Sequence, residues 1–246
     1  MFDSYAEIFS RRAAEYHSAM TRSPRARDAE FLAAVEPLRG LPPGLVCDIP
    51  AGGGYLADYL WPGMRYLGIE PAKDFLDASP RSIEQLNADI RNVPLADGTV
   101  DYIVSLAGLH HEPDLGAVFG EMRRLLRPGG RLVIADVAVD TPPARFLNGF
   151  VDRHNPLGHV GKFLDEGTVG SLLGAGFAVD SDSVVAVPWT FASDEEAGEF
   201  GRHLFGVTGL DAATVARALD EEIGVDQADG RLRLSWTLRR IVADAV

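Results

Sequence analysis

Residues 46–54 read Val-Cys-Asp-Ile-Pro-Ala-Gly-Gly-Gly, an apolar run that ends in three consecutive glycines. The apolar run predicts a short buried strand. Glycines that follow a strand let the backbone pass close to a ligand at a point where any Cβ would clash. They also open a helix whose N-terminal amides can meet a carboxylate or a phosphate. The stretch therefore predicts a ligand-binding turn between the first strand and first helix of an α/β unit.

Strands and helices alternate along the residues that follow this turn. Strands are expected at residues 45–49, 65–70, 82–89, 100–106 and 131–136, with a helix at 115–126. Further on, we expect a helix at 165–173 and strands at 177–187 and 232–242. Apolar strands alternating with helices indicate a doubly wound, mostly parallel sheet with helices on both faces, which is a Rossmann-like α/β fold.

The irregular segments divide the chain of 246 residues, which we expect to form a single domain. Residues 1–39 predict an N-terminal helical cap, broken near Ser23-Pro24, and residues 40–140 the cofactor-binding core. Residues 141–163 predict an ordered loop or lid, and residues 188–228 a helical insertion. Because insertions on a regular scaffold carry specificity, these last two segments are expected to bind the acceptor molecule.

Charge and composition narrow the class of ligand. The formal net charge is −13, and an acidic surface repels phosphate backbones, so we expect a small-molecule ligand and no nucleic acid. No apolar run is long enough to span a membrane, and the first residues do not resemble a signal peptide. A single cysteine, Cys47, excludes an internal disulfide. We therefore expect a cytoplasmic protein; a homodimer remains open.

Glu70 ends the second expected strand, 22 positions after Asp48. An acid at this place can accept hydrogen bonds from both hydroxyls of a ribose, as in dinucleotide-binding folds. The feature suits NAD and S-adenosylmethionine equally, so it supports a nucleoside ligand without naming it.

Residues 87–102, which lead into the fourth expected strand, distinguish between these cofactors. Here the chain resembles the class I S-adenosylmethionine-dependent methyltransferases, in the branch that includes ubiquinone and menaquinone biosynthesis enzymes. Five motifs of that branch occur in order at family-like spacings, at residues 48–54, 68–70, 88–101, 109–114 and 126–130. The resemblance covers about residues 40–180 and implies S-adenosylmethionine as cofactor.

The resemblance also implies a set of residues that contact the cofactor: Tyr16, Asp48, Ala51, Gly52, Gly54, Glu70, Asp89, Ile90 and Leu106. By this comparison the glycines line the methionine and ribose, and Glu70 holds the ribose. Asp89 meets the adenine amino group, Ile90 packs on the adenine, and Leu106 lies beside the methionine. The hydroxyl of Tyr16 is expected at the methionine carboxylate.

One residue departs from the family pattern. Pro50 stands where the family usually has its first glycine, and proline has a fixed φ and no N–H to donate. That backbone position therefore donates no hydrogen bond to the cofactor. Since Gly52 and Gly54 are retained, we interpret Pro50 as a tolerated variant.

Histidines supply the candidate acceptor site. His110 and His111 follow the fourth expected strand, at the sheet edge where open α/β sheets bind ligands. Histidine suits proton transfer at neutral pH, so His110 is the candidate general base for an O-methylation. His111, His154, His159 and Trp189 are the candidate acceptor contacts. We expect no metal site, because no carboxylate or cysteine partner accompanies the histidines.

Two other functions remain open at this point. An NAD-dependent oxidoreductase would use the same glycine turn and acid. A non-catalytic binding module on the same fold is the third hypothesis, because fold alone does not determine function.

Overall fold

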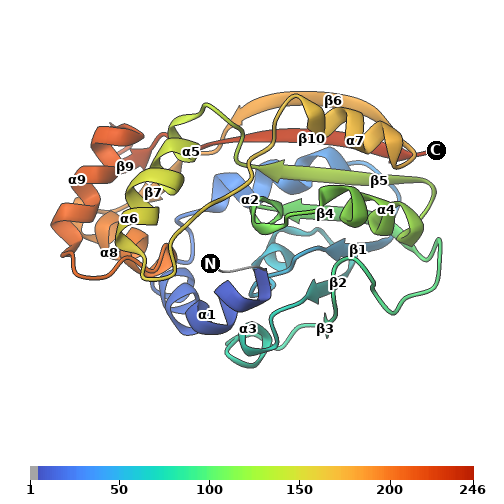
Figure 1. The fold of residues 1–246 in the computed structure, drawn as a ribbon, viewed down its shortest axis with the longest axis horizontal. Helices are drawn as coiled ribbons and strands as arrows, with labels where there is room; N and C mark the ends of the chain where they lie inside the picture. Colours follow the sequence, from blue (N-terminus) through green and yellow to red (C-terminus); the bar gives the residue numbers. More distant parts are fainter. Residues whose placement is uncertain (1–4) are drawn as a thin grey trace.

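Seven strands form one sheet in the order β3-β2-β1-β4-β5-β10-β6 (Figure 1). The computed structural model describes residues 5–246, without the side chains of residues 7 and 8, so the first four residues of the expected cap lie outside it. The strands are β1 (Leu45–Asp48), β2 (Arg65–Glu70), β3 (Gln85–Asn87), β4 (Val100–Leu106), β5 (Leu126–Asp136), β6 (Phe177–Ala186) and β10 (Thr237–Ala245).

Parallel pairing joins β3, β2, β1, β4 and β5, whereas β10 runs antiparallel to both β5 and β6. The chain order of the strands reverses at β1, which lies between β2 and β4. At such a reversal the loops after the two central strands diverge and leave a crevice for a ligand. The expected α/β fold is confirmed.

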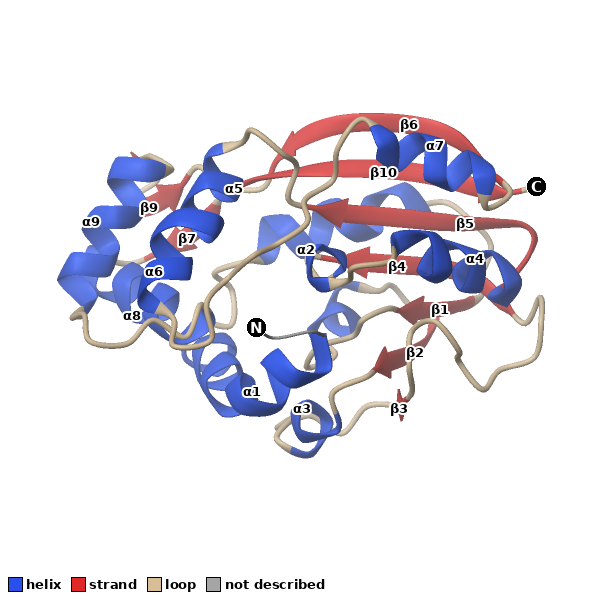
Figure 2. Cartoon of the chain, in the orientation of Figure 1, coloured by secondary structure: helices blue, strands red, loops and turns tan. Residues whose placement is uncertain are grey.

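Helices cover both faces of this sheet (Figure 2). Helices α4 (Leu115–Leu125) and α7 (Gly167–Gly174) lie together on one face. Helix α2 (Asp28–Val35) packs on β4 and β5 from the other face. Neighbouring strand residues such as Val133 and Ile134 belong to separate cores on opposite faces and are fully buried. Burial on both faces explains the near-continuous apolar strands of the sequence.

A smaller unit packs beside the carboxyl ends of the strands (Figure 1). It contains the sheet β7-β9-β8, formed by β7 (Trp189–Phe191), β9 (Arg231–Leu234) and β8 (Val225–Ala228), with helices α8 (Asp194–Leu204) and α9 (Ala212–Glu222). Helix α1 (Tyr5–Arg22) connects the two units, because it contacts both α8 and the short helix α3 (Lys73–Asp77) that follows β2. No helix of the described chain is long and apolar enough to cross a membrane.

Three expected elements differ from the structure. The strand expected at 232–242 is two strands, β9 in the small sheet and β10 in the large one, because the chain changes sheet at residues 235–236. The loop expected at 141–163 begins with α5 (Pro142–Phe146), one π-helical turn and α6 (Asp152–His154). Its apolar residues are buried, which favours helix despite the prolines at the start. The strand expected at 82–89 is shorter.

Adjacent leucines of α7 provide a matched test of the packing. Leu172 is fully buried under α4, whereas Leu173 points outward with 55% of its surface exposed. We expect Leu172→Ala to lower the free energy of unfolding by about 2–5 kcal/mol, because the truncation leaves a cavity. Leu173→Ala should change it by about 0.5 kcal/mol or less. Denaturant titration measures both, and similar losses would contradict this packing.

Candidate active site

A cavity opens at the carboxyl ends of β1 and β4, where the strand order reverses. Its empty space is about 910 Å³, counting the part open to solvent. The loops after β1 and β4 form one wall, α1 forms a second, and the small unit closes the third. Residues far apart in sequence thus surround one space.

The glycine turn lies at the edge of this cavity. Gly52 and Gly54 adopt left-handed backbone conformations, with φ of +56° and +70°. A Cβ on Gly54 would lie 1.7 Å from Cδ1 of Ile83, so the position requires glycine. Ala51 and Gly52 line the cavity, whereas Gly54 lies behind it. The peptide bond before Pro50 is cis, and the proline ring packs against Gly108 of the loop after β4.

Glu70 is fully buried at the end of β2. One carboxylate oxygen accepts from the backbone N–H of Gly52 at 2.8 Å and from the Tyr5 hydroxyl at 3.2 Å, and the other accepts from the N–H of Ala72 at 2.8 Å. Burial raises the pKa of Glu70 to about 8, although these three hydrogen bonds favour the ionised form. Glu70 therefore joins β2, the glycine turn and α1.

Asp48 supplies a second buried carboxyl at the end of β1, and it lines the cavity. The Tyr66 hydroxyl donates to it at 2.9 Å. Burial raises the pKa of Asp48 well above its usual range, and the nearby Glu70 adds to the effect. Leu106, at the end of β4, faces the same space. A cationic ligand at this point would favour the ionised form of the Asp48 carboxyl.

Asp89 and Ile90 do not form part of the cavity wall. The Asp89 side chain is half exposed and pairs with Arg91, whose Nε lies 3.0 Å from the carboxylate. This hydrogen bond lowers the pKa of Asp89. Ile90 is buried in the core on the α4 face. The adenine contacts inferred for both residues remain predictions.

His110 and Asp136 form a buried pair beside β4. The Nδ1–H of His110 donates to Oδ1 of Asp136 at 2.6 Å. Asp136 is fully buried at the end of β5, and its carboxylate also accepts from the backbone N–H groups of Leu109 and Val137. Because the oxygens of Asp136 already accept from these backbone groups, the pair fixes the proton on Nδ1 of His110. The other ring nitrogen, Nε2, is left as an acceptor on a residue that lines the cavity.

His111 and His159 approach His110 from two directions. The ring centroids lie 4.1 Å apart for His110 and His111, and 5.6 Å apart for His110 and His159. His159 Nδ1 lies 2.9 Å from Oδ1 of Asn148. Burial, together with the other histidines, lowers the pKa of His111 well below its usual range and that of His159 to about 3. Both rings are therefore neutral at physiological pH.

The three rings also satisfy the geometry of a shared metal site, since their ligand atoms lie within 4.8 Å of one another. The positive charge of Arg12, however, acts on both His111 and His159 and helps to lower their pKa values. A second positive charge at this point would be repelled. The chemistry of the cluster therefore favours an anionic or neutral polar ligand.

Tyr16 and Trp189 line the cavity and share one buried network. Nη1 of Arg27 donates to the Tyr16 hydroxyl at 2.9 Å, and Arg27 also pairs with the fully buried Glu30. Nε1–H of Trp189 donates to the same carboxylate at 2.7 Å. The network ties α1, α2 and β7 together and holds both aromatic rings in place.

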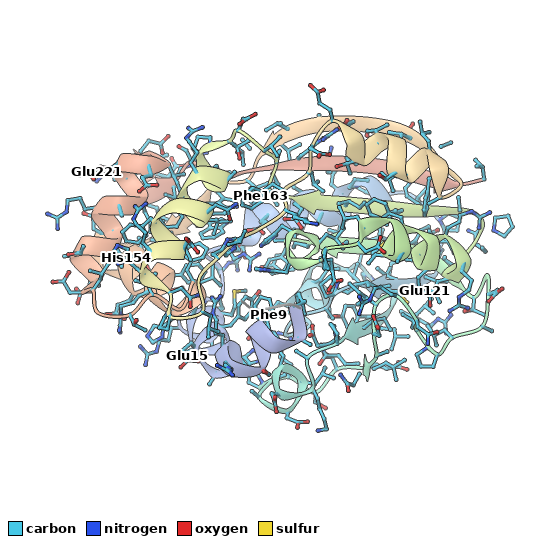
Figure 3. The ribbon with its side chains drawn as sticks, in the orientation of Figure 1. Phe9, Glu15, Glu121, His154, Phe163 and Glu221 are labelled. Atoms are coloured by element: carbon cyan, nitrogen blue, oxygen red, sulfur yellow. The ribbon has the colours of Figure 1, made fainter. Side chains whose placement is uncertain are left out.

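His154, expected to contact the acceptor, lies outside the cavity wall, so this contact remains a prediction. The ring of His154 packs on Phe150 at 4.8 Å. In Figure 3 it lies among the helices of the small unit, on the same side as Glu221, whereas Phe9 and Phe163 lie near the middle of the molecule. The helix that extends through residue 154, in place of the expected loop, carries this side chain away from the site.

Several residues of the site were not anticipated from the sequence. Asp136 follows the apolar residues 132–135 at the end of β5, and an acid at the end of a buried strand could have been predicted to belong to the site. Arg12 shares a helix face with Phe9, Ala13 and Tyr16, and a cation within such an apolar stripe was another signal. The contribution of Glu30 had no sequence signal, since a lone acid on a helix is ordinary.

Comparison with known families agrees with this geometry. Residues 47–134, which run from β1 to β5 and include Glu70 and His110, match the family described as a methyltransferase domain. This part of the chain is therefore similar to methyltransferase domains.

Curated relatives of this domain share about a third of its residues. A malonyl-[acyl-carrier protein] O-methyltransferase from Xylella fastidiosa is 31% identical over 154 residues, which are 57% of this chain and 51% of that protein. An uncharacterised 37.1 kDa protein of a Streptomyces fradiae transposon is 31% identical over 157 residues, 59% of this chain and 45% of that protein. The chain thus spans about half the length of these relatives.

Solved structures show the same fold at lower identity. An S-adenosylmethionine-dependent methyltransferase from Thermotoga maritima superposes with a TM-score of 0.64 at 17% identity, over 98% of this chain and 99% of that one. A geranyl diphosphate methyltransferase solved with S-adenosylmethionine superposes with a TM-score of 0.60 at 16% identity, over 94% and 90% of the two chains.

Proposed function

We propose that this protein transfers a methyl group from S-adenosylmethionine to an oxygen atom of a small organic molecule, with His110 as the general base. The observation that carries the proposal is the His110–Asp136 pair in the cavity wall, at the edge of the sheet that the methyltransferase fold uses for ligands. The five ordered sequence motifs support a place in the branch that includes the ubiquinone and menaquinone enzymes.

The residues at the ends of β1 and β2 fit the cofactor. When bound, S-adenosylmethionine supplies a methyl group already activated by a positively charged sulfur. The buried carboxyl of Asp48 suits that positive charge, and Gly52 lets the backbone approach without a Cβ. Glu70 would accept the ribose hydroxyls in place of the Tyr5 hydroxyl. Leu106 gives an apolar contact on the β4 side.

His110 is oriented to accept a proton. Because Asp136 fixes the hydrogen on Nδ1, the lone pair of Nε2 is available to an acceptor hydroxyl. The carboxylate also stabilises the imidazolium that forms as the hydroxyl oxygen takes the methyl group. Neutral His111 and His159 beside it can orient the acceptor by hydrogen bonding without adding positive charge.

The segments 141–163 and 188–228 would enclose the acceptor. They contribute His159 and Trp189 to the cavity, and Trp189 stacks on Trp236 with centroids 4.3 Å apart. Together with Phe9 of α1, these rings make an apolar wall that excludes water and holds the acceptor in line. The net charge of −13 also favours a small molecule over a nucleic acid.

Cofactor binding tests the first half of the proposal. Glu70→Ala and Asp89→Ala should each weaken binding of S-adenosylhomocysteine by about 1–3 kcal/mol, because each leaves polar groups of the nucleoside unpaired. Asp74→Ala, which removes an exposed acid of α3, is the matched control and should bind normally. Calorimetry measures all three, and a wild type that binds no S-adenosylhomocysteine would contradict the proposal.

The pH dependence of that binding gives a second readout for Glu70. The ribose hydroxyls donate to the ionised carboxylate, whereas the pKa of Glu70 is raised to about 8 in the free protein. Binding therefore favours loss of a proton, and affinity should increase as pH rises from 6 to 8 and level off above. Glu70→Gln should flatten this profile; an unchanged profile would remove Glu70 from the ribose site.

The second half of the proposal concerns His110. His110→Ala should lower kcat by about 10²–10⁴-fold with nearly unchanged cofactor affinity, and the loss should shrink at high pH, where the acceptor hydroxyl ionises without help. Asp136→Asn should also lower kcat, because the amide does not fix the same tautomer.

His203→Ala is the control, since His203 lies on α8 beside Glu199 and outside the cavity wall. Turnover is measured as S-adenosylhomocysteine release across a panel of hydroxylated acceptors. A His110→Ala enzyme with normal turnover at neutral pH would remove the general-base role.

A further inference from the structure

Arg12 is a buried cation in the wall of the cavity. It lies on the inner face of α1, and only 8% of its surface is exposed. Phe9 and Tyr16 lie on the same face of the helix and line the same cavity, whereas Glu15 is exposed at the surface of the helix (Figure 3). A charged side chain is almost never buried this far unless it is paired or used.

A second buried arginine of the cavity wall, Arg27, is paired with a carboxylate. Arg27 is equally buried, and its guanidinium lies 2.5 Å from the carboxylate of Glu30. No carboxylate of the described residues forms an ion pair with Arg12, although the negative charge of Glu15 on the same helix acts on it. Its Nη2 donates to the backbone carbonyl of Leu204 at 2.5 Å, and its buried Nε has no hydrogen-bond partner. Burial lowers the pKa of Arg12 to about 10, so the group stays charged at neutral pH.

The surroundings of the guanidinium place it beside the histidine cluster. Cζ of Arg12 lies 5.8 Å from the centre of the Phe9 ring, which in turn packs edge-on against His111 with centroids 5.3 Å apart. The charge of Arg12 acts on both His111 and His159. A Cβ on Gly206 would lie 2.7 Å from Nε, so the small residue leaves room for the guanidinium.

The rest of this end of the cavity is apolar and aromatic. Trp189 and Trp236 stack, and Phe205 packs against both with centroids 6.0 Å away. The side chain of Leu147 completes the wall. Such a pocket accepts a flat apolar body, and the Arg12 guanidinium and the rings of His110, His111 and His159 are among its polar contacts.

We propose that Arg12 binds a carboxylate of the acceptor, so that the acceptor is a small, flat, apolar carboxylic acid. The inference rests on the proposed function, because it names the acceptor of that reaction. An ionised carboxylate supplies the missing counter-charge and hydrogen-bond acceptors for the guanidinium. The carboxylate is the recognition group rather than the methylated group, because a carboxylate oxygen is already ionised and needs no base such as His110.

Carboxylate binding is measured by calorimetry with three acids, benzoate, 3-phenylpropanoate and indole-3-acetate, each against its own primary amide. The protein is saturated with S-adenosylhomocysteine and freed of metal with EDTA. For at least one pair, the wild type should bind the acid ten to a hundred times more tightly than the amide. Arg12→Met should reduce that ratio to about one, and Arg12→Lys should keep part of it.

Arg22→Met is the matched control, since Arg22 is an exposed arginine of the same helix and should leave the ratio unchanged. Melting temperature and near-ultraviolet circular dichroism check that each variant is folded. If Arg12→Met does not fold, Arg12→Lys carries the test, because it keeps the charge and loses the planar fork. An unchanged ratio in Arg12→Lys would then overturn the proposal.

Other results overturn it directly. A wild type that binds none of the acids, or shows no preference for them over the amides, excludes a carboxylate site. If Arg12→Met still binds the acids more tightly than the amides, the carboxylate site lies elsewhere. If the wild type prefers the acids before EDTA treatment and not after it, the preference belongs to a metal at the histidines.

Cofactor analogues test whether Arg12 binds a carboxylate of the acceptor or the carboxylate in the methionine part of the cofactor. Arg12→Met should bind S-adenosylhomocysteine within threefold of the wild type. A tenfold loss for S-adenosylhomocysteine, with unchanged binding of 5′-methylthioadenosine, which lacks that carboxylate, would assign Arg12 to the cofactor. Absence of S-adenosylhomocysteine binding in the wild type would instead contradict the proposed function, while the acids can still be titrated against the free protein.

Discussion

The carboxylate of Glu70 holds the end of β2 to the turn after β1. Its hydrogen bonds to the N–H groups of Gly52 and Ala72 fix two loops at the point where the strand order reverses. A buried carboxylate is costly unless donors surround it, and here the donors are backbone groups that the turn would otherwise leave unpaired. The two loops that this constraint fixes lie beside the β1 side of the cavity, which Asp48, Ala51 and Gly52 line.

This cavity is polarised. The carboxyl group of Asp48 lines its β1 end, with Glu70 buried nearby, whereas Arg12 and the neutral rings of His111 and His159 make the end near α1 and α8 receptive to anions. A cationic cofactor and an anionic acceptor would therefore bind at opposite ends with their reacting atoms between them. His110 lies between these ends, held by Asp136 from the neighbouring strand. Positioning of this kind is the main contribution that a protein makes when the transferred group is already activated.

The fold could be predicted from the sequence because local signals and burial agree along β1 to β5. The apolar strands, the glycine turn and the position of Glu70 all indicate one parallel sheet. The small unit could not be predicted in the same way, since residues 232–242 predict one continuous strand and the change of sheet depends on tertiary packing. The pairing of Asp136 with His110 is likewise a property of neighbouring strands. The position of the His154 ring, packed on Phe150 outside the cavity wall, depends on the helices between residues 142 and 154, which the sequence did not predict.

Hydrogen exchange with and without S-adenosylhomocysteine tests most directly whether the cofactor binds where the strand order reverses. The account predicts that the ligand slows exchange of the amides at residues 50–54, 70–72 and 106–111, while residues 225–234 of the small sheet exchange at an unchanged rate. Slowing confined to the small sheet, or no slowing at the ends of β1, β2 and β4 despite saturating ligand, would contradict it.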